Sequence, residues 1–537
     1  MPTLAEQLVK SLQALGVKYV FGIPGGPSIP YLEAMRNTGL KFVLVANEQS
    51  AGIMADVCGR LTGVPGVCHS TFGPGAANLS TGVGGALLDR SPLIAFTTEV
   101  KDADRGRNIQ MNIDHQAFYK PITKWTTRLS ADNFKETMVK AFSIAASEVP
   151  GPVHIGLPAN IDNELLDSDS IIDRFEKAVV PLPEPRLLQE AAVLIQKAKK
   201  PILAVGLSIA RLGLHHLLRQ FVNQNNIPVV LTPMAKGVIS DTHSCYAGVL
   251  FHAQSDLVAT VFREADLVIG VGYDSVEFNY ESWMPNVPLI HIDTRPVDIT
   301  TEYNVPCEVI GDLAQSITYL TSLKFLSFQW DMGQIEANKH NLFQALKPRC
   351  DSFTAADAIH VLQEVIPKDG IITADVGAHL HLLGQLWKVD EPQRIIMTNG
   401  WSTMGFGIPS AIGAKLCRPS QTVVCITGDG GFLMNCGELV TARRLGLNIV
   451  IIVLCDRSLS LIEMKQNWKE VPLYGVDLYE GNYFGADMFL SVPVLKVCDE
   501  KEMKTALQTA VSAAGPIIIE AVIDGSIYNN LVTRSHK

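Results

Sequence analysis

The sequence has 537 residues, of which 47% are hydrophobic and 18% charged, and its formal net charge is −10 at pH 7. This hydrophobic fraction excludes an intrinsically disordered chain, and because a single core stops growing at about 250–300 residues, we expect two to four domains. The acidic balance argues against a nucleic-acid-binding protein, which would show a basic surface.

The N-terminal residues predict an amphipathic helix and no targeting signal. Leu4, Leu8, Leu12 and Leu15 recur at helical spacing, and the segment lacks the apolar core and cleavage site of a secretory signal. No apolar run reaches the roughly 18 residues needed to cross a membrane. The ten cysteines are scattered without a CxxC pair, as expected of reduced, buried thiols. We therefore expect a cytoplasmic protein with no membrane or nucleic-acid partner.

Short apolar runs rich in β-branched residues alternate with helical segments along the whole chain. Such runs are typical of parallel sheets covered by helices on both faces. The composition changes at the proline-bearing segment 179–186 and at the poorly periodic segment 323–348. The sequence thus predicts an α/β protein with three doubly wound parallel-sheet domains, over residues 1–180, 187–325 and 350–537. The first and last of these each resemble a six-stranded unit.

The most informative segment is TGDGGFLMNCGELVTARRLGLNIVIIVLCD, residues 427–456. A strand ends at the GDGG turn, a helix follows, and a second strand ends at Asp456. Asp429 and Asp456 are 456 − 429 = 27 residues apart, one βαβ crossover, so both lie at the carboxyl ends of parallel strands. Glycines let backbone N–H groups approach a phosphate, and two carboxylates beside a diphosphate suit Mg²⁺. A capped tight turn would explain GDGG alone but not the second acid.

Together with this motif, several segments in a fixed order resemble the thiamine-diphosphate-dependent enzymes. They are FGIPGG (21–26), NEQSAGIMADVCGRLTG (47–63), STFGPGAANLSTGVGGALLDRSPLIAFT (70–97), TADVGAHLH (373–381) and NGWSTMGFGIPSAIGAK (399–415). The resemblance covers nearly the whole chain, is closest to the FAD-independent, catabolic acetolactate synthases, and implies pyrimidine-binding, central and diphosphate-binding domains. One departure is Cys455–Asp456, which replaces the family's pair of asparagines. Asp456 still offers an oxygen ligand.

The resemblance implies a role for each matching residue. Glu48 would hydrogen-bond N1′ of the aminopyrimidine, and Met404 would support the bent cofactor. Asp429, Asp456 and the backbone carbonyl of Ser458 would hold Mg²⁺. The other residues implied to bind thiamine diphosphate are Pro24, Gly25, Gly26, Gly377, Ala378, His379, Gly400, Ser402, Gly428, Gly430 and Gly431. Because Glu48 and Met404 meet only across a subunit interface in this family, the resemblance also implies a homodimer or homotetramer.

The substrate side falls on residues 108–125, NIQMNIDHQAFYKPITKW. By resemblance, Gln110 and His115 face the reacting carbonyl and are candidates for proton transfer or substrate orientation, since histidine is an acid–base near neutral pH. An exposed loop histidine is the ordinary alternative. The paired histidines of pyruvate decarboxylases are replaced by Asp114–His115–Gln116, which favours carbon–carbon bond formation over simple decarboxylation.

The central third argues against bound FAD, because AVGLSIAR (204–211) lacks the glycine cluster of flavin-binding relatives. The leading hypothesis is a thiamine-diphosphate- and Mg²⁺-dependent carboligase that acts on small 2-oxo acids and is similar to acetolactate synthase. One alternative is a 2-oxo-acid decarboxylase, or an acyloin synthase or lyase, with bulkier substrates. Another is a non-catalytic regulatory paralogue.

Overall fold

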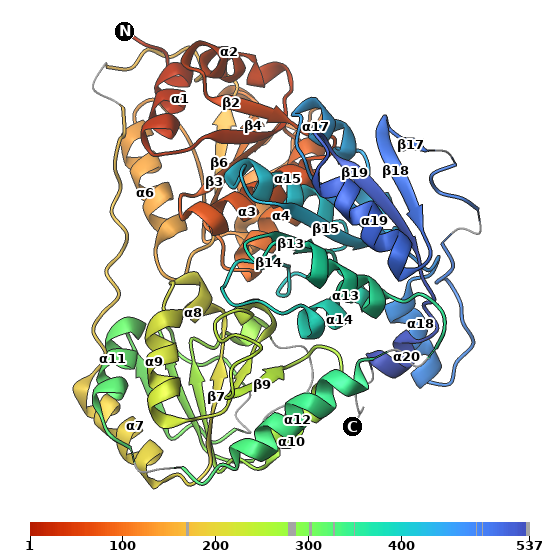
Figure 1. Cartoon of the computed structure of the whole chain (residues 1–537). Coiled ribbons are helices and arrows are strands. Elements are labelled where there is room, and N and C mark those ends of the chain that lie inside the picture. The colour runs from red at the N-terminus through yellow and green to blue at the C-terminus, as the bar shows by residue number, and fades with distance from the viewer. Residues whose placement is uncertain are drawn as a thin grey trace.

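The computed structural model describes residues 1–167, 171–277, 286–299, 303–325, 328–347, 350–478, 481–485 and 487–532. Three largely parallel sheets follow one another along the chain, each with helices packed against it (Figure 1). This arrangement confirms the predicted fold class. Every helix in the described ranges is too short or too polar to cross a lipid bilayer.

The N-terminal sheet has six parallel strands in the order β2-β1-β3-β4-β6-β5. The strands are β1 (Tyr19–Ile23), β2 (Lys41–Leu44), β3 (Gly66–Ser70), β4 (Leu93–Glu99), β5 (Trp125–Arg128) and β6 (Pro152–Pro158). The helices are α1 (Leu4–Ala14), α2 (Ile29–Thr38), α3 (Glu48–Thr62), α4 (Pro74–Leu88), α5 (His115–Tyr119) and α6 (Phe134–Ala146). Strands β3, β4 and β6 are buried along their whole length, as expected of strands covered on both faces.

The first helix, α1, shows how the leucine spacing becomes packing. Leu4, Leu8 and Leu12 are all buried, on the face turned to the sheet. The Thr3 hydroxyl accepts the Glu6 N–H, and the Glu6 carboxylate accepts the Thr3 N–H. This capping box satisfies two backbone donors at the start of the helix, which explains why the helix begins at Leu4, directly after Thr3.

The central sheet has six parallel strands in the order β12-β11-β10-β7-β8-β9. The strands are β7 (Pro201–Val205), β8 (Val229–Leu231), β9 (Tyr246–Val249), β10 (Leu267–Val271), β11 (Leu289–Asp293) and β12 (Cys307–Ile310). The helices are α7 (Pro185–Lys197), α8 (Leu207–Arg211), α9 (His215–Asn225), α10 (Ser255–Arg263), α11 (Leu313–Ser322) and α12 (Met332–Ala345). The chain runs outward from β7 in one direction and from β10 in the other, which places the topological switch point between these two strands.

Helix α12 lies inside the segment that the sequence predicts to be poorly periodic. Ile335 and Leu342 are the apolar side chains that this helix buries. Two buried apolar positions in fourteen residues give a weak periodic signal, so the sequence pattern does not reveal this helix.

The C-terminal sheet has seven strands in the order β14-β13-β15-β16-β19-β18-β17, and only β17 is antiparallel to its neighbour. The strands are β13 (Ile371–Ala374), β14 (Ile395–Ile396), β15 (Val423–Gly428), β16 (Val450–Cys455), β17 (Met488–Phe489), β18 (Val492–Val497) and β19 (Ile517–Val522). The helices are α13 (Ala355–Val365), α14 (Ala378–Leu386), α15 (Gly407–Cys417), α16 (Asp429–Asn435), α17 (Glu438–Arg444), α18 (Ser460–Trp468), α19 (Glu500–Val511) and α20 (Tyr528–Leu531). The expected six strands are therefore wrong, because two-residue edge strands leave no pattern in the sequence. The switch point lies between β13 and β15.

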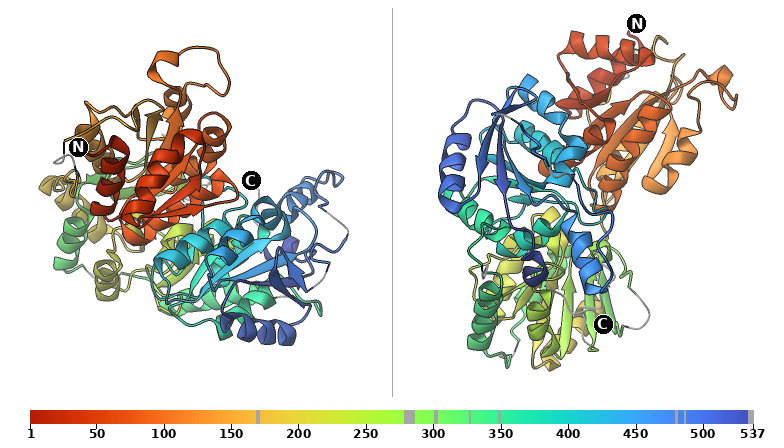
Figure 2. Two further views of the ribbon diagram at one scale, coloured as in Figure 1. Left: turned by 90° about the horizontal axis from the view of Figure 1, so that it is seen from above. Right: turned by 90° about the vertical axis from the view of Figure 1, so that its right-hand side faces the viewer.

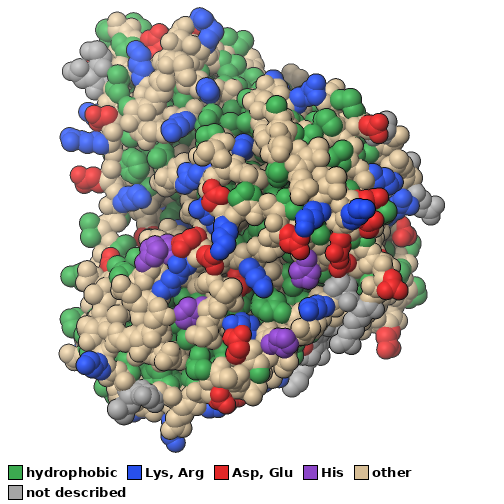
Figure 3. Space-filling model, viewed as in Figure 1, with side chains coloured by type: hydrophobic (Ala, Val, Ile, Leu, Met, Phe, Trp, Pro, Cys, Tyr) green, Lys and Arg blue, Asp and Glu red, His purple; other side chains and the backbone are tan. Residues whose placement is uncertain are grey.

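The N- and C-terminal domains lie beside each other with α3 and α15 at their junction, and the central domain lies below both in Figure 1 (Figures 1 and 2). On the face shown in Figure 3, Lys and Arg side chains are interspersed with Asp and Glu. All ten cysteines are free thiols. Cys350 and Cys498 are exposed, so the predicted burial is wrong for these two, which lie in loops.

Candidate functional site

A cavity of about 220 Å³ lies at the carboxyl ends of β13, β15 and β16, at the switch point of the C-terminal sheet. Open α/β sheets bind ligands at this position. The predicted residues that line it are Gly377, Ala378, His379, Ser402, Met404, Gly428, Asp429, Gly430, Gly431, Asp456 and Ser458. The structure therefore brings most of the predicted diphosphate- and metal-binding residues together.

Two carboxylates face this cavity, that of Asp429, which is buried, and that of Asp456, which is half-buried. Asp429 Oδ2 accepts the Arg457 N–H at 2.8 Å, and Asp456 accepts the Ser458 N–H at 3.3 Å and the hydroxyl of Ser460. Burial raises the pKa of Asp456 to about 7, and the nearby charge of Asp429 adds to this rise. Burial also raises the pKa of Asp429. A divalent cation between the two carboxylates would remove the penalty of charging both, so this donor set fits Mg²⁺.

A histidine also lines the cavity. His379, at the start of α14, is buried, and its Nε2 has no hydrogen-bond partner among the described residues. Burial lowers the pKa of His379 to about 4. A Cβ at Gly377 would lie 2.7 Å from the His379 ring, so glycine is needed there for the chain to pass the ring. An unpartnered ring nitrogen beside a helix N-terminus fits a phosphate group.

Asp375, which the sequence reasoning missed, fixes the walls of the cavity. It follows β13 and is buried. Its Oδ1 accepts the N–H groups of Val376 (2.7 Å) and Gly405 (2.9 Å), and its Oδ2 accepts the Gly407 N–H (3.0 Å) and the Thr427 hydroxyl (3.2 Å). The carboxylate thereby ties the turn after residue 404 to two neighbouring strands. The sequence feature that could have identified Asp375 is its position as an acidic residue directly after an apolar strand.

Glu48 lies in the N-terminal domain, outside this cavity. It is the first residue of α3, is buried, and accepts a hydrogen bond from the Asn78 side-chain amide at 3.1 Å. The N–H groups of Ala46 and Asn47 donate to Glu438 Oε1 at 2.9 and 3.1 Å. Glu438 belongs to α17, so the C-terminal domain of the same chain fixes the start of the helix that carries Glu48.

Four other predicted residues also lie outside the cavity lining. Pro24, Gly25 and Gly26 form the turn after β1, at the switch point between β1 and β3, and Gly26 is exposed. Gly400 precedes the cavity-lining residues Ser402 and Met404, and its N–H donates to Asp89 of the N-terminal domain at 2.9 Å.

The predicted substrate loop places its two candidate residues in different surroundings. Gln110 is exposed, whereas His115 is only 2% exposed. The Gly73 N–H donates to His115 Nε2 at 3.4 Å, so the neutral ring carries its proton on Nδ1 and donates to the Thr97 hydroxyl at 2.7 Å. The Thr97 hydroxyl in turn donates to His154 Nε2 at 2.8 Å. Burial lowers the pKa of His115 to about 4, so this histidine is a buried, neutral member of a hydrogen-bonded chain.

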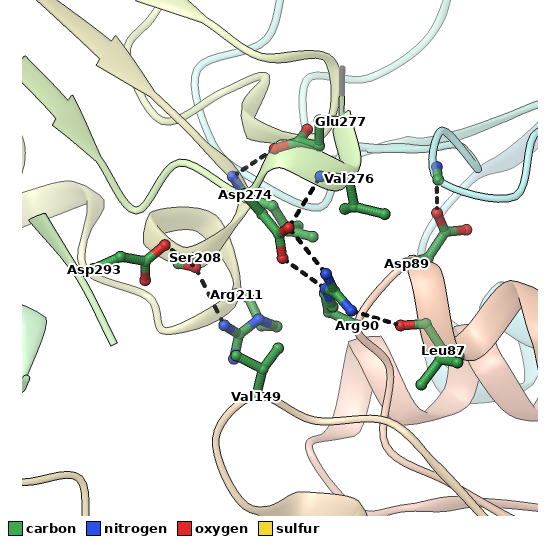
Figure 4. A network of polar contacts seen from close by, with 12 residues as sticks. Leu87, Asp89, Arg90, Val149, Ser208, Arg211, Asp274, Val276, Glu277 and Asp293 are labelled. Carbon is green, nitrogen blue, oxygen red and sulfur yellow. Dashed lines mark hydrogen bonds and ion pairs between the residues drawn. The ribbon is translucent and has the colours of Figure 1, made fainter. Parts of the chain in front are cut away.

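Polar side chains of the chain itself bond to one another and to the backbone beside the switch point of the central sheet (Figure 4). The Glu277 carboxylate accepts the Leu207 N–H at 3.0 Å and the Met234 N–H at 2.9 Å. Arg90 of the N-terminal domain pairs with Asp274 at 2.6 Å. The backbone donors at the ends of β7 and β8 therefore already have an acceptor within the chain.

Comparison with known proteins agrees with this geometry. The chain matches the family models described as thiamine pyrophosphate enzyme, N-terminal TPP binding domain (residues 2–118), central domain (188–320) and C-terminal TPP binding domain (375–521). It is 31% identical to a probable acetolactate synthase large subunit of Methanococcus aeolicus, over 97% of this chain and 92% of that protein. It is 29% identical to the acetolactate synthase isozyme 1 large subunit of Escherichia coli K12 (97% and 94% covered) and to the acetolactate synthase of Bacillus subtilis 168 (98% and 94%). The chain belongs to the thiamine pyrophosphate (thiamine diphosphate) enzymes and is an enzyme similar to the acetolactate synthases.

Proposed function

We propose that the protein is a Mg²⁺-dependent carboligase that decarboxylates a small 2-oxo acid and joins the remaining carbon unit to a second carbonyl compound. The observation that carries this proposal is the similarity, over nearly the whole chain, to proteins named acetolactate synthase. When bound, thiamine diphosphate supplies the carbon nucleophile and the electron sink that decarboxylation needs. The residues of the chain bind this cofactor, orient it and control protons around it.

The C-terminal cavity supports a specific assignment of the cofactor-binding residues. Asp429, Asp456 and the Ser458 carbonyl hold Mg²⁺, because hard oxygen ligands at a diphosphate suit this ion. His379 and the glycine-lined turns receive the diphosphate, and Met404 supports the cofactor from the turn that Asp375 fixes. Glu48 hydrogen-bonds the aminopyrimidine.

The active unit in this proposal is a homodimer or homotetramer with cofactor sites at subunit interfaces. Support comes from the separation of Glu48, in the N-terminal domain, from the C-terminal cavity. In the part of the chain that the structure describes, residues of the C-terminal domain alone line this cavity. Leu433 and Met434 of α16, next to the GDGG turn, are also exposed. Exposed apolar side chains of this kind are expected where a partner subunit would cover the surface.

Mixing two inactive variants tests this arrangement. In a mixed dimer of Glu48→Gln and Asp456→Ala chains, one site combines two intact halves and the other combines two damaged halves. Random reassociation makes half of the dimers mixed, so the mixture should recover about a quarter of wild-type activity. If mixing at high concentration recovers nothing, each site is complete within one chain and the interface proposal fails. Asp456→Ala mixed with Asp429→Ala is the matched control, because both changes damage the same half and no dimer gains an intact site.

On the substrate side, we assign His115 an orienting role. Both of its ring nitrogens are bonded within the N-terminal domain, and its low pKa leaves it neutral. It therefore holds no proton ready for the reacting carbon, which would be needed to release a free aldehyde. This favours carbon–carbon bond formation over simple decarboxylation. The exposed side chain of Gln110 is the candidate for direct substrate contact.

We also propose that the enzyme works without FAD. A dinucleotide diphosphate at the central switch point would need the N–H groups that Glu277 already occupies, and it would meet that buried carboxylate. The purified protein should therefore lack flavin absorbance and be fully active without added flavin. A stoichiometric yellow compound released on denaturation would contradict this proposal.

Product analysis tests the central proposal. The protein is incubated with thiamine diphosphate, Mg²⁺ and a panel of 2-oxo acids, with and without a second carbonyl compound, and the products are identified by mass spectrometry. The expected products are 2-hydroxy ketones or acetohydroxy acids. If every 2-oxo acid gives only free aldehyde and carbon dioxide, even with excess acceptor, the carboligase proposal fails.

A further inference from the structure

Two cysteines from different domains face each other where the N- and C-terminal domains meet. Cys58 lies in α3, Cys417 is the last residue of α15, and their Sγ atoms are 3.0 Å apart. Four residues earlier in each helix, a Cβ on Gly413 would lie 3.0 Å from the carbonyl oxygen of Met54. Because residues four apart lie on the same face of a helix, the close approach at Gly413 also brings the two cysteines together.

The two thiols differ in exposure and in electrostatic surroundings. Cys58 is buried, whereas Cys417 is half-buried. The hydrogen bond with Cys58 lowers the pKa of Cys417, and the cations Arg418 and Lys18 lower it further against the effect of burial. The same bond and burial raise the pKa of Cys58. Cys417 is thus the more easily ionised thiol, and Cys58 stands within reach to react with an oxidised Cys417.

We propose that Cys58 and Cys417 are a modification site at which a hydroperoxide forms a reversible disulfide between the two domains. The Cys417 thiolate attacks the peroxide, so that an S–O bond forms, the O–O bond breaks, and the departing oxygen takes a proton and leaves as water (or, from an alkyl hydroperoxide, as the alcohol). The Cys58 sulfur then attacks Cys417; the S–S bond forms, the S–O bond breaks, and the hydroxide leaves as water with the Cys58 proton. Two thiols are oxidised by two electrons and one peroxide is reduced. A small dithiol reverses the bond.

The disulfide would join two helices whose N-terminal ends carry cofactor-binding residues. Helix α3 begins at Glu48, and α15 follows the turn that carries Met404. The two cysteines are 359 residues apart in the chain. Cross-links stabilise a protein mainly by restricting its unfolded chain, and more so for long loops. Oxidation should therefore fix the N-terminal domain against the C-terminal domain and raise the melting temperature.

Mass spectrometry of the full-length protein tests this site without reference to catalysis. The protein is treated with stoichiometric hydrogen peroxide, its free thiols are alkylated, and it is digested without reduction. We expect a linked pair of peptides that contain Cys58 and Cys417, lighter by two hydrogen atoms than the separate peptides, which disappears with dithiothreitol. Oxidised protein should melt several degrees above reduced protein.

Variants separate this site from oxidation elsewhere. Cys417→Ser should remove both the linked peptides and the peroxide-dependent rise in melting temperature, and Cys58→Ser should do the same. Cys350→Ser, at an exposed cysteine, should keep both. The proposal is overturned if peroxide converts Cys417 to sulfinic acid while Cys58 stays a free thiol. It is also overturned if reduced Cys417→Ser melts at the same temperature as the reduced wild type and still shows the rise in melting temperature after peroxide treatment.

Discussion

Replacing Asp375 by asparagine tests whether one buried carboxylate holds the cofactor cavity in shape. The amide oxygen can still accept the Val376 and Gly405 N–H groups, but its NH₂ group must then face the Gly407 N–H, 3.0 Å from the original oxygen. Leaving this buried N–H without an acceptor costs about 1–3 kcal/mol, and the remaining bonds weaken when they lose their charged acceptor. The sum is about 3 kcal/mol, which corresponds to a fall in Tm of about 6–12 °C for a domain of this size.

The assay compares melting of the cofactor-free protein with its affinity for thiamine diphosphate and Mg²⁺. Affinity should fall together with Tm, because the turn that Asp375 holds also positions Met404. Asp369→Asn is the matched control, since Asp369 is an exposed aspartate in the turn before β13. If Asp375→Asn shifts Tm and cofactor affinity no more than Asp369→Asn does, the carboxylate does not organise the cavity.

Three further predictions concern single side chains of the proposed site. Glu48→Gln should keep cofactor binding and lower turnover by orders of magnitude; an unchanged rate of H/D exchange at the cofactor's C2 would rule out the assigned role. Asp429→Asn and Asp456→Asn should each raise the Mg²⁺ concentration needed for cofactor binding by about tenfold or more, as measured by titration, and unaltered titrations would exclude the metal site. Burial lowers the folded-state pKa of His115 to about 4, so its contribution to stability is present above the unfolded pKa and lost as pH falls. Between about pH 7.5 and about pH 5.5, the wild type should lose about 1 kcal/mol more unfolding free energy than His115→Asn; equal losses in denaturant titrations would show that folding does not lower the pKa of His115.

Most central strands of the sheets could be predicted from sequence, whereas several edge strands could not. Strands β15 and β16 are continuous apolar runs because helices cover both of their faces. The edge strand β5, with the sequence WTTR, is half-buried throughout, so it lacks the continuous apolar run that marks the buried strands. Strands β14 and β17 have two residues each, too few for a period to appear.

The proposed cofactor motif could be recognised for a similar reason, because its residues belong to one local unit of the chain. The GDGG turn, the helix and the next strand form one βαβ unit, so chain spacing alone places Asp429 near Asp456. The role of Asp375 depends on backbone donors 30 and 32 residues away in the chain. The surroundings of His115 depend on Thr97, whose hydroxyl also bonds to His154, 57 residues after Thr97. Such partners are set by how strands and loops pack, which no spacing rule contains.

The central and C-terminal domains reach opposite outcomes from the same backbone arrangement. Both sheets reverse direction at a switch point, which leaves backbone donors at the carboxyl ends of adjacent strands. In the central domain, the Glu277 carboxylate already accepts the Leu207 N–H after β7, at the switch point, and the Met234 N–H after the neighbouring strand β8. In the C-terminal domain, the glycines at 428 and 430 keep the strand ends open, and His379 Nε2 has no partner among the residues described. Since an anion gains most where donors lack an acceptor, the C-terminal crevice is the one that suits a diphosphate. A carboxylate of the chain can thus take the place of a ligand's anion in one domain, while the same arrangement of strands in another domain stays open to a diphosphate.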